Sequence, residues 1–328
     1  MTGAPDNILE VDKLITSFET DRGLLRAVDQ VSFSVPKGKT VGIVGESGCG
    51  KSVTAMSIVR LLPQPAGKIL GGHVYFKGHD ILRASESEIR KIRGGDIGVI
   101  FQEPMSALNP VHRIGKQVAE VFRLHRKISK KDAWDAATEM LQLVRIPAPE
   151  KRMMDYPHQL SGGMRQRIVI ALALACRPAL VIADEPTTAL DVTVQAQILD
   201  LMGGLQSEMG MSIILITHDL GVIAETCDEV VVMYAGRVVE RTSAEELFAN
   251  PLHAYTKGLL NSIPTLDTPS KSILNTIPGM VASLADHTHG CRFCQRMGRV
   301  DRRSRERPAF AEVSPGHWVE TCPECYQP

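Results

Sequence analysis

Residues 45–52 restrict the fold of this chain most, because they join a glycine-rich loop to a lysine and a serine. The preceding run, Thr40-Val-Gly-Ile-Val44, is typical of a buried strand, and residues 53–62 are compatible with a helix. The loop has the spacing G-x-x-x-x-G-K-S in the strand-loop-helix context that this motif requires. Its glycines let backbone N–H groups surround a phosphate, and the helix adds its positive end. The sequence therefore predicts a phosphate-binding loop.

The loop and the residue after it are expected to form most of a nucleotide site. Lys51 is predicted to neutralise the β- and γ-phosphates, and the Ser52 hydroxyl to bind Mg²⁺. A turn that only connects a strand to a helix is the alternative, but glycine, lysine and serine in register favour nucleotide binding. The expected contacts are Gly45, Glu46, Ser47, Gly48, Cys49, Gly50, Lys51, Ser52 and Val53.

Polar side chains follow three further apolar runs, those of residues 97–101, 180–183 and 212–217; they are Gln102, Asp184, Glu185 and His218. The carboxyl ends of parallel strands form the ligand-binding edge of a sheet. We therefore expect Asp184 to hold Mg²⁺ with Ser52 and Gln102, and Glu185 to polarise the water that attacks the γ-phosphate. Gln102 is also a candidate catalytic residue, because its side chain could reach this water. His218 is predicted to contact the same water, although such a histidine is often a surface or cap residue.

The order of these elements predicts an α/β fold with a mostly parallel sheet, because β-branched runs alternate with segments of helical periodicity. Residues from about 103 to 160 interrupt this pattern with two helix-like stretches, 114–125 and 130–144. We expect them to form an inserted helical subdomain. After Pro264 the chain becomes rich in arginine and cysteine, which indicates a domain boundary. The predicted organisation is a P-loop NTPase domain over residues 1–264 and a small C-terminal extension over residues 265–328.

Charge and hydropathy limit the classes of partner. Lys plus Arg and Asp plus Glu both number 37, so no net charge attracts nucleic acid or an anionic membrane. The first residues lack the basic start and apolar run of a secretion signal. The longest apolar stretch, residues 168–176, is far shorter than the ~20 residues of a membrane-spanning helix. Any contact with a membrane is thus expected to depend on specific partners.

Residues 156–167, Tyr-Pro-His-Gln-Leu-Ser-Gly-Gly-Met-Arg-Gln-Arg, resemble the LSGGQ signature of ABC ATPases, with Met164 where glutamine is commonest. The resemblance covers about residues 8–264 and implies ATP as the nucleotide. It implies that the signature faces ATP held by a partner subunit; its residues are Leu160, Ser161, Gly162 and Gly163. It also implies that Gln102 belongs to the Q-loop, Asp191 to the D-loop and His218 to the switch. Phe18 matches the aromatic residue that stacks on adenine, and a core residue is the alternative for it.

Longer stretches resemble one branch of this family, the ATPases of dipeptide, oligopeptide and nickel importers; they are residues 101–110, 156–159, 183–191, 232–236 and 251–256, with Gly290-Cys291 and Gly316-His317. The resemblance implies an ATPase that drives uptake of di- or oligopeptides, with nickel or another small solute as the alternative. It implies a heterodimer with a second, homologous ATPase on two transmembrane permeases, supplied by a solute-binding protein. The expected place is peripheral, on the cytoplasmic face of the inner (plasma) membrane.

A soluble ABC ATPase that acts on ribosomes or DNA is the alternative from another class. Such proteins usually carry two ATPase units in one chain or a long coiled coil, and the sequence has neither. Nucleic acid is therefore not expected as a partner.

The four cysteines near the end form two C-x-x-C pairs, Cys291 with Cys294 and Cys322 with Cys325, separated by residues 295–321. Two such pairs indicate a metal site, either tetrahedral Zn²⁺ or an iron–sulfur cluster. The family resemblance implies a [4Fe–4S] cluster with Zn²⁺ as the alternative, although the spacing departs from the family's pattern. Disulfides and free thiols remain open, and so does an added role as a redox or metal sensor.

Overall fold

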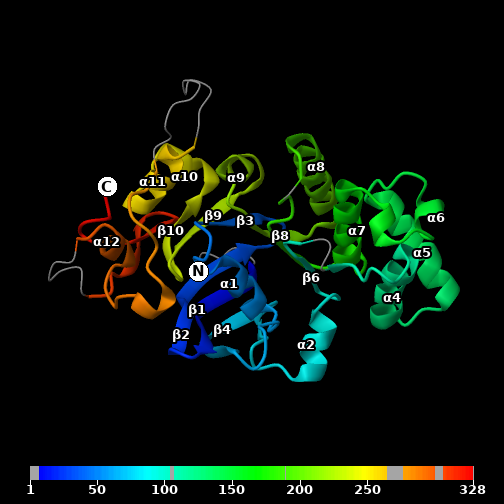
Figure 1. Cartoon of the computed structure of the whole chain (residues 1–328), viewed down its shortest axis with the longest axis horizontal. Coiled ribbons are helices and arrows are strands. Elements are labelled where there is room, and N and C mark those ends of the chain that lie inside the picture. Colours follow the sequence, from blue (N-terminus) through cyan, green and yellow to red (C-terminus); the bar gives the residue numbers. More distant parts are fainter. Residues whose placement is uncertain (1–6, 104–106, 189, 264–275, 300–305, 328) are drawn as a thin grey trace. The chain divides into compact units, whose positions relative to one another are not determined.

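The computed structural model describes residues 7–103, 107–188, 190–263, 276–299 and 306–327. The chain folds into two compact units, which are described separately (Figure 1). The first unit contains residues 1–8, 35–39 and 83–216, and the second contains residues 9–34, 40–82 and 217–328. The expected boundary at residues 264–265 lies outside the described residues, and so do the first six residues and residues 104–106 of the predicted insert. None of the described helices has the length and apolar character needed to span a bilayer.

Parallel strands form the centre of the first unit. Strand β7 (Leu180–Asp184) pairs in parallel with β6 (Ile97–Ile100) on one side and with β8 (Ser212–Ile216) on the other. All residues of β7 and β8 are buried, as expected for β-branched runs that are covered on both faces. The three predicted strands of this unit therefore form where the sequence placed them.

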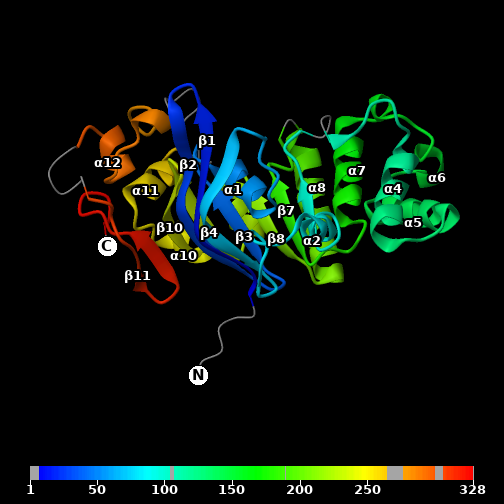
Figure 2. The same ribbon diagram turned by 90° about the horizontal axis from the view of Figure 1, so that it is seen from below.

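Helices α4 (Ile114–Arg126) and α5 (Lys130–Leu143) lie against each other and against α7 (Gly162–Leu174), as Figures 1 and 2 show. The hydroxyl of Ser129 accepts a hydrogen bond from the Asp132 N–H and so fixes the start of α5. These two helices match the predicted stretches 114–125 and 130–144. The other described helices of the unit are α2 (Glu86–Ile92), α6 (Pro149–Arg152), the 3₁₀ turn η1 (Pro157–Gln159) and α8 (Val192–Met209).

An antiparallel sheet with the strand order β2-β1-β4-β5 belongs to the second unit and was not predicted from the sequence. Its strands are β1 (Asn7–Thr20), β2 (Gly23–Pro36), β4 (Gly67–Phe76) and β5 (His79–Asp80). In β2 the alternate residues Val31, Phe33 and Val35 are buried, which is the period of a strand with one face in the core.

The second unit also contains the strand order β11-β12-β10-β9-β3. Strand β3 (Thr40–Val44) pairs in parallel with β9 (Glu229–Tyr234), and antiparallel strands then follow: β10 (Arg237–Ser243), β12 (His317–Glu320) and β11 (Phe310–Ser314). The tail thus adds two strands to this sheet (Figure 2). The described helices of the unit are α1 (Lys51–Ile58), α9 (Leu220–Thr226), α10 (Ala244–Ala249), α11 (Ala254–Asn261), the 3₁₀ turn η2 (Leu284–Asp286) and α12 (Arg292–Arg296).

Asp29 of β2 fastens the tail to the rest of the second unit. Its side chain is almost fully buried and accepts hydrogen bonds from Arg237 Nε of β10 and Arg292 Nη2 of α12, each at 2.9 Å. Arg26 donates a further one, and Arg307 of the tail lies 3.3 Å away. Burial alone would raise the pKa of this carboxyl, but the hydrogen bonds from Arg237 and Arg26 hold it well below its usual range. The carboxylate is therefore charged at neutral pH and joins three segments of the chain.

Asp29→Asn is expected to lower the free energy of unfolding by about 3–5 kcal/mol at neutral pH, because it leaves buried guanidinium groups without their counter-charge. The native pKa is depressed, so this contribution is complete above the unfolded pKa of 3.8 and is lost as the pH falls through the native pKa. Chemical denaturation across this pH range measures the free energy of unfolding of both proteins. The two values should become equal as the pH falls. Asp21→Asn, at an exposed position, is the control. If the free energies of unfolding of wild type and Asp29→Asn differed by the same amount at every pH, the ionic interpretation would be wrong.

Candidate functional site

The predicted phosphate loop connects β3 to α1 in the second unit, and two of its glycines have no room for a side chain. Gly45 has a φ of +150°, and a Cβ there would lie 2.2 Å from the carbonyl oxygen of Met233. Gly50, with a φ of +102°, would place a Cβ 2.7 Å from the carbonyl oxygen of Ala27. Backbone atoms, which cannot move aside cheaply, are the obstacle at both places. Glycine is therefore required for the loop to keep this shape.

Lys51 lies inside this loop with only 5% of its surface exposed. Its Nζ donates hydrogen bonds to the carbonyl oxygens of Gly45, at 2.8 Å, and Glu46, at 3.1 Å. Ser52 follows in the first turn of α1 and is half-buried. Burial raises the pKa of the Cys49 thiol, so this loop residue is neutral and unreactive. The loop thus encloses one ammonium, and one half-buried hydroxyl follows it in α1.

Two other predicted ATP-site residues, Phe18 and His218, also belong to the second unit. Phe18 of β1 is half-buried and pairs with Gly67 of β4, where an added Cβ would lie 3.3 Å from the Phe18 ring. His218 follows β8 and is exposed. The next residue, Asp219, caps α9 by accepting hydrogen bonds from backbone N–H groups. The cap is therefore Asp219 and not His218.

Glu185 and Gln102 come together in the first unit, each just after a strand. The Gln102 Nε2 and the Thr188 hydroxyl both donate to Glu185 Oε2, each at 2.9 Å. Glu185 has a φ of +47°, and its N–H donates to the carbonyl oxygen of Ile216. Asp184, the last residue of β7, is 5% exposed. The predicted Mg²⁺ ligands thus fall in both units, with Gln102 and Asp184 in the first and Ser52 in the second.

The signature residues form the start of α7 in the first unit. Ser161 is the N-cap and accepts a hydrogen bond from the Met164 N–H, which is one of the N–H groups of the first turn that lack a partner within the helix. A Cβ at Gly163 would lie 2.9 Å from Val194 Cγ1 in the first turn of α8. Asp191 caps α8 by accepting from the Val194 N–H. Leu160 is buried. The fold therefore brings the signature and the predicted D-loop side by side.

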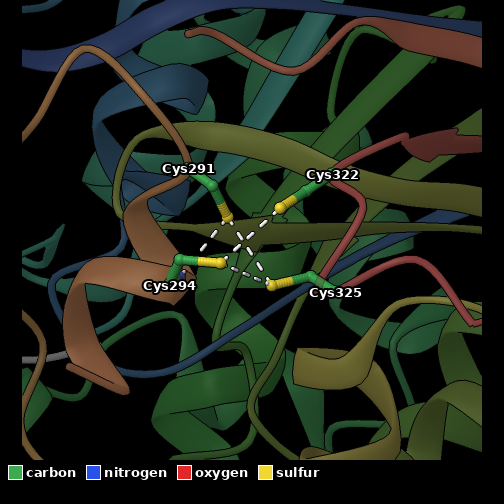
Figure 3. Close-up of side chains that lie close together, drawn as sticks. All are labelled: Cys291, Cys294, Cys322 and Cys325. Carbon is green, nitrogen blue, oxygen red and sulfur yellow. Dashed lines mark hydrogen bonds between the residues drawn. The ribbon is translucent and has the colours of Figure 1, made fainter. Parts of the chain in front are cut away.

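The four tail cysteines point toward one another (Figure 3). Their sulfur atoms all lie within 4.8 Å of each other, and all four residues are buried. The Sγ of Cys294 is 3.3 Å from that of Cys325 and 3.5 Å from that of Cys322, and Cys291 is 3.6 Å from Cys325. Hydrogen bonds among the four thiols, those with Cys291 first, lower the pKa values of Cys322 and Cys294, whereas hydrogen bonds with the neighbouring thiols raise those of Cys291 and Cys325. Cys322 and Cys294 therefore lose their protons first, and the thiolate is the form that binds metal.

Two separate segments carry these cysteines. Cys291 is the N-cap of α12, where its sulfur accepts a hydrogen bond from the Cys294 N–H. Cys322 and Cys325 follow β12, which is held by His317: its Nε2 lies 2.8 Å from the buried carboxylate of Glu240 in β10. The hairpin of β11 and β12 thus returns the second C-x-x-C pair to the first. A cavity of about 370 Å³ reaches Cys294 and Cys325.

Sequence reasoning missed the residues that surround the cysteines. His253 is fully buried; burial lowers its pKa to about 4, and its Nδ1 accepts a hydrogen bond from the Tyr255 N–H. Phe293, between Cys291 and Cys294, contacts the rings of His253, Tyr234 and Tyr255. Residues 251–256, which contain His253 and Tyr255, contributed only to the family resemblance, and no motif assigns a role to Phe293.

Comparisons with known proteins identify the family of the chain. Residues 28–188 match the family described as ABC transporter, and residues 239–300 match the one described as oligopeptide/dipeptide transporter, C-terminal region. The chain is 50% identical to the oligopeptide transport ATP-binding protein OppD of Bacillus subtilis, over 96% of this chain and 88% of that protein. It is 52% identical to the dipeptide transport ATP-binding protein DppD of the same organism, over 89% of this chain and 87% of that protein.

Solved structures show the same fold. The ATP-binding cassette MJ0796, in a dimeric post-hydrolysis state bound to ADP and Pi, matches with a TM-score of 0.64 and 27% identity over 72% of this chain and 98% of that one. CbiO1 from Clostridium perfringens, part of the ABC transporter complex cbiONQ, also matches with a TM-score of 0.64, at 29% identity over 75% of this chain and 92% of that one. With its phosphate loop, signature helix and C-terminal region, this chain belongs to the ATP-binding subunits of ABC transporters, in the branch with the oligopeptide/dipeptide transporter C-terminal region.

Proposed function

We propose that this chain is the ATP-hydrolysing subunit of an importer of di- or oligopeptides. The observation that carries the proposal is the match over nearly the whole chain, tail included, to proteins named for oligopeptide and dipeptide transport. The ATPase domain comprises residues 1–264, with the helical insert at about 103–160, and the tail comprises residues 265–328. Import of nickel or another small solute is the second candidate, because the resemblance includes nickel importers of the same branch.

In this proposal the phosphate loop binds ATP through its backbone N–H groups and Lys51, and Phe18 stacks on the adenine. Ser52, Gln102 and Asp184 hold Mg²⁺ or its water shell. Glu185 orients the attacking water and accepts its proton, and His218 contacts the γ-phosphate. The support is the Gln102–Glu185 hydrogen bond of 2.9 Å, which holds the carboxylate at the end of its strand. In this proposal the residues that hydrolyse ATP and those that bind Mg²⁺ both lie at or beyond the carboxyl ends of strands, where open α/β sheets bind their ligands.

A second ATPase subunit completes each site in the proposed assembly. The signature residues, beginning with the Ser161 cap, bind the ATP held by the partner's phosphate loop, and Asp191 lies at the same interface. The dimeric state of the related MJ0796 cassette supports this arrangement. The partner is a homologous subunit, so the pair is a heterodimer on two permeases. A solute-binding protein delivers the substrate, and the ATPase lies at the cytoplasmic face of the inner membrane.

The four cysteines form a thiolate site for a metal. A single tetrahedral ion with bonds of about 2.3 Å to sulfur places its ligands about 3.8 Å apart. Three of the six sulfur pairs are 3.3–3.6 Å apart, and all six lie within 4.8 Å, a range that includes this value. A [4Fe–4S] cluster binds each thiolate to a different iron and needs a wider set. The spacing therefore favours Zn²⁺ over the cluster that the family resemblance implies, and the ion would join α12 to the end of β12.

The proposed function is tested by assembling this chain with its permeases and partner ATPase in proteoliposomes. We expect ATP-dependent accumulation of a labelled di- or oligopeptide when the solute-binding protein is present. The same vesicles tested with ⁶³Ni²⁺ give the matched control for the second candidate. Nickel uptake without peptide uptake would overturn the peptide assignment, and stimulation of ATP hydrolysis by neither solute would overturn both.

A further inference from the structure

The tail of the chain contacts the phosphate loop directly, at Glu46. This residue lies within G-x-x-x-x-G-K-S at a position where the motif allows any side chain. Its N–H donates a 2.9 Å hydrogen bond to the Tyr255 hydroxyl, its carbonyl oxygen accepts from Lys51 Nζ at 3.1 Å, and its carboxylate pairs with Arg296. Tyr255 and Arg296 lie in the region that matches the oligopeptide/dipeptide transporter C-terminal family. All of these residues belong to the second unit.

Arg296 has a buried side chain that makes several hydrogen bonds, unlike the arginine of an exposed salt bridge. Its side chain is 4% exposed, and both terminal nitrogens donate to the carboxylate of Glu46. Nε donates to the backbone carbonyl oxygen of Pro278 at 2.9 Å, and Nη2 also lies 3.0 Å from that of Ile277 and 3.1 Å from that of Gly279. A forked guanidinium fixes a carboxylate in direction as well as in distance. The orientation of Glu46 is therefore set by the tail.

Helix α12 connects Arg296 to the four cysteines by a short route. Cys291 caps this helix, Cys294 lies in its middle, and Arg296 ends it. Phe293 gives a second path, because its ring contacts the ring of Tyr255, with 5.6 Å between centroids, and the Tyr255 hydroxyl accepts from the Glu46 N–H. A shift of α12 thus alters two of the three groups that hold Glu46.

Lys51 makes Glu46 important to nucleotide binding. The Lys51 ammonium is held by the carbonyl oxygens of Gly45 and Glu46, and both peptide groups belong to the first turn of the loop. If the Glu46 side chain is released, this turn keeps its backbone contacts, such as those with Tyr255 and Lys51, but loses the side-chain contact, and the ammonium is held less firmly in one place. A loop that already has its binding conformation loses less conformational entropy when it binds phosphate. Its affinity for phosphate is therefore higher.

We propose that Arg296 is a positioning residue for the ATP site: through Glu46 it presets the phosphate loop, and through α12 it makes ATP affinity depend on the integrity of the four-cysteine site. The proposal rests on the proposed ATPase function. Because two linked sites affect each other equally, ATP also stabilises the cysteine site by the same factor. The expected effect is on affinity, since Arg296 contacts the loop that holds the phosphates and no group that acts on the attacking water.

The experiment compares Arg296→Gln, Arg296→Lys, Glu46→Gln and the double variant Glu46→Gln/Arg296→Gln in the full-length chain. Arg296→Gln is expected to raise the Kd for a fluorescent ATP analogue about tenfold, which is the size of one charge-assisted hydrogen bond. Arg296→Lys keeps the charge but lacks the planar guanidinium with its two parallel donors. Its Kd should lie between those of Arg296→Gln and the wild type. The double variant should bind no more weakly than either single variant, because both break the same contact. In the assembled transporter, KM for ATP should rise about as much, with kcat changed less than about threefold.

Arg299→Gln is the matched control, because it removes the same charge from an exposed position three residues further on. A wild-type affinity in folded Arg296→Gln, or additive effects in the double variant, would overturn the proposal. Addition of a thiol-competing chelator should weaken ATP binding in the wild type and cause little further loss in Arg296→Gln. Equal chelator effects in both would show that the cysteine site does not act through Arg296. A wild type that binds ATP but drives no transport would contradict the proposed function while leaving this coupling testable by binding.

Discussion

Glu185→Gln should leave ATP bound but reduce its hydrolysis by about 10²–10⁴-fold, the usual contribution of a general base. Glutamine has the shape of glutamate, and its carbonyl oxygen can still accept from Gln102 Nε2 and the Thr188 hydroxyl, which both contact Glu185 Oε2. The strand end therefore keeps its conformation. Only the ability to accept a proton from the attacking water is lost. Binding of a fluorescent ATP analogue and phosphate release by the assembled transporter measure the two effects separately.

Glu208→Gln in α8 is a suitable control, because it makes the same chemical change at an exposed position of the same unit. It should leave both ATP binding and hydrolysis unchanged. If Glu185→Gln hydrolysed ATP at the wild-type rate in the assembled transporter, Glu185 would not be the base, and Gln102 and Thr188 would merely hold a structural carboxylate. A parallel loss of ATP binding would point to a distorted loop instead.

The parallel strands were predictable because burial on both faces demands continuous apolar runs. Residues 180–183 and 212–216 show this directly, and the structure makes strands of both. The phosphate loop was predictable for a different reason: at Gly45 and Gly50, backbone atoms of distant segments exclude a side chain, so the chemistry of the loop is visible in its composition. Helices α4 and α5 were predictable from their periodicity.

The antiparallel sheet was less accessible from sequence. Its strands are buried on one face only, and β1 contains irregular pairing between Asp12 and Thr16 that breaks the alternation of apolar and polar residues. Contacts between distant segments were also invisible. Glu46 and Arg296 are 250 positions apart, and neither occupies a place that a motif assigns. The sequence pattern predicted that the four cysteines could bind a metal, but only the β11–β12 hairpin shows how the second pair reaches the first.

Cys322→Ser should remove the metal from the tail and loosen it. Loss of even an outer partner of a metal ligand weakens binding about 10–100-fold, so loss of one of four thiolates should weaken it by more than about 100-fold. Zinc and iron content, acid-labile sulfide and the visible spectrum of anaerobically purified protein measure the occupancy. Hydrogen exchange of residues 291–296 and 317–325 measures the loosening, which we expect because metal binding stabilises the segments that supply its ligands.

Cys176→Ser, at a half-buried position in the first unit, is the control for cysteine loss and should change neither metal content nor exchange. Zinc in the wild type would support the single-ion site that sulfur atoms within 4.8 Å of one another favour, whereas iron with sulfide would require the four thiolates to move apart around a cluster. A wild type without metal, and a Cys322→Ser variant with unchanged exchange, would contradict both. The tail would then be held by other contacts: the ion pairs of Asp29, the Glu240–His317 hydrogen bond and the aromatic contacts of Phe293. In that case the link from α12 to the phosphate loop would be permanent and could not respond to a metal.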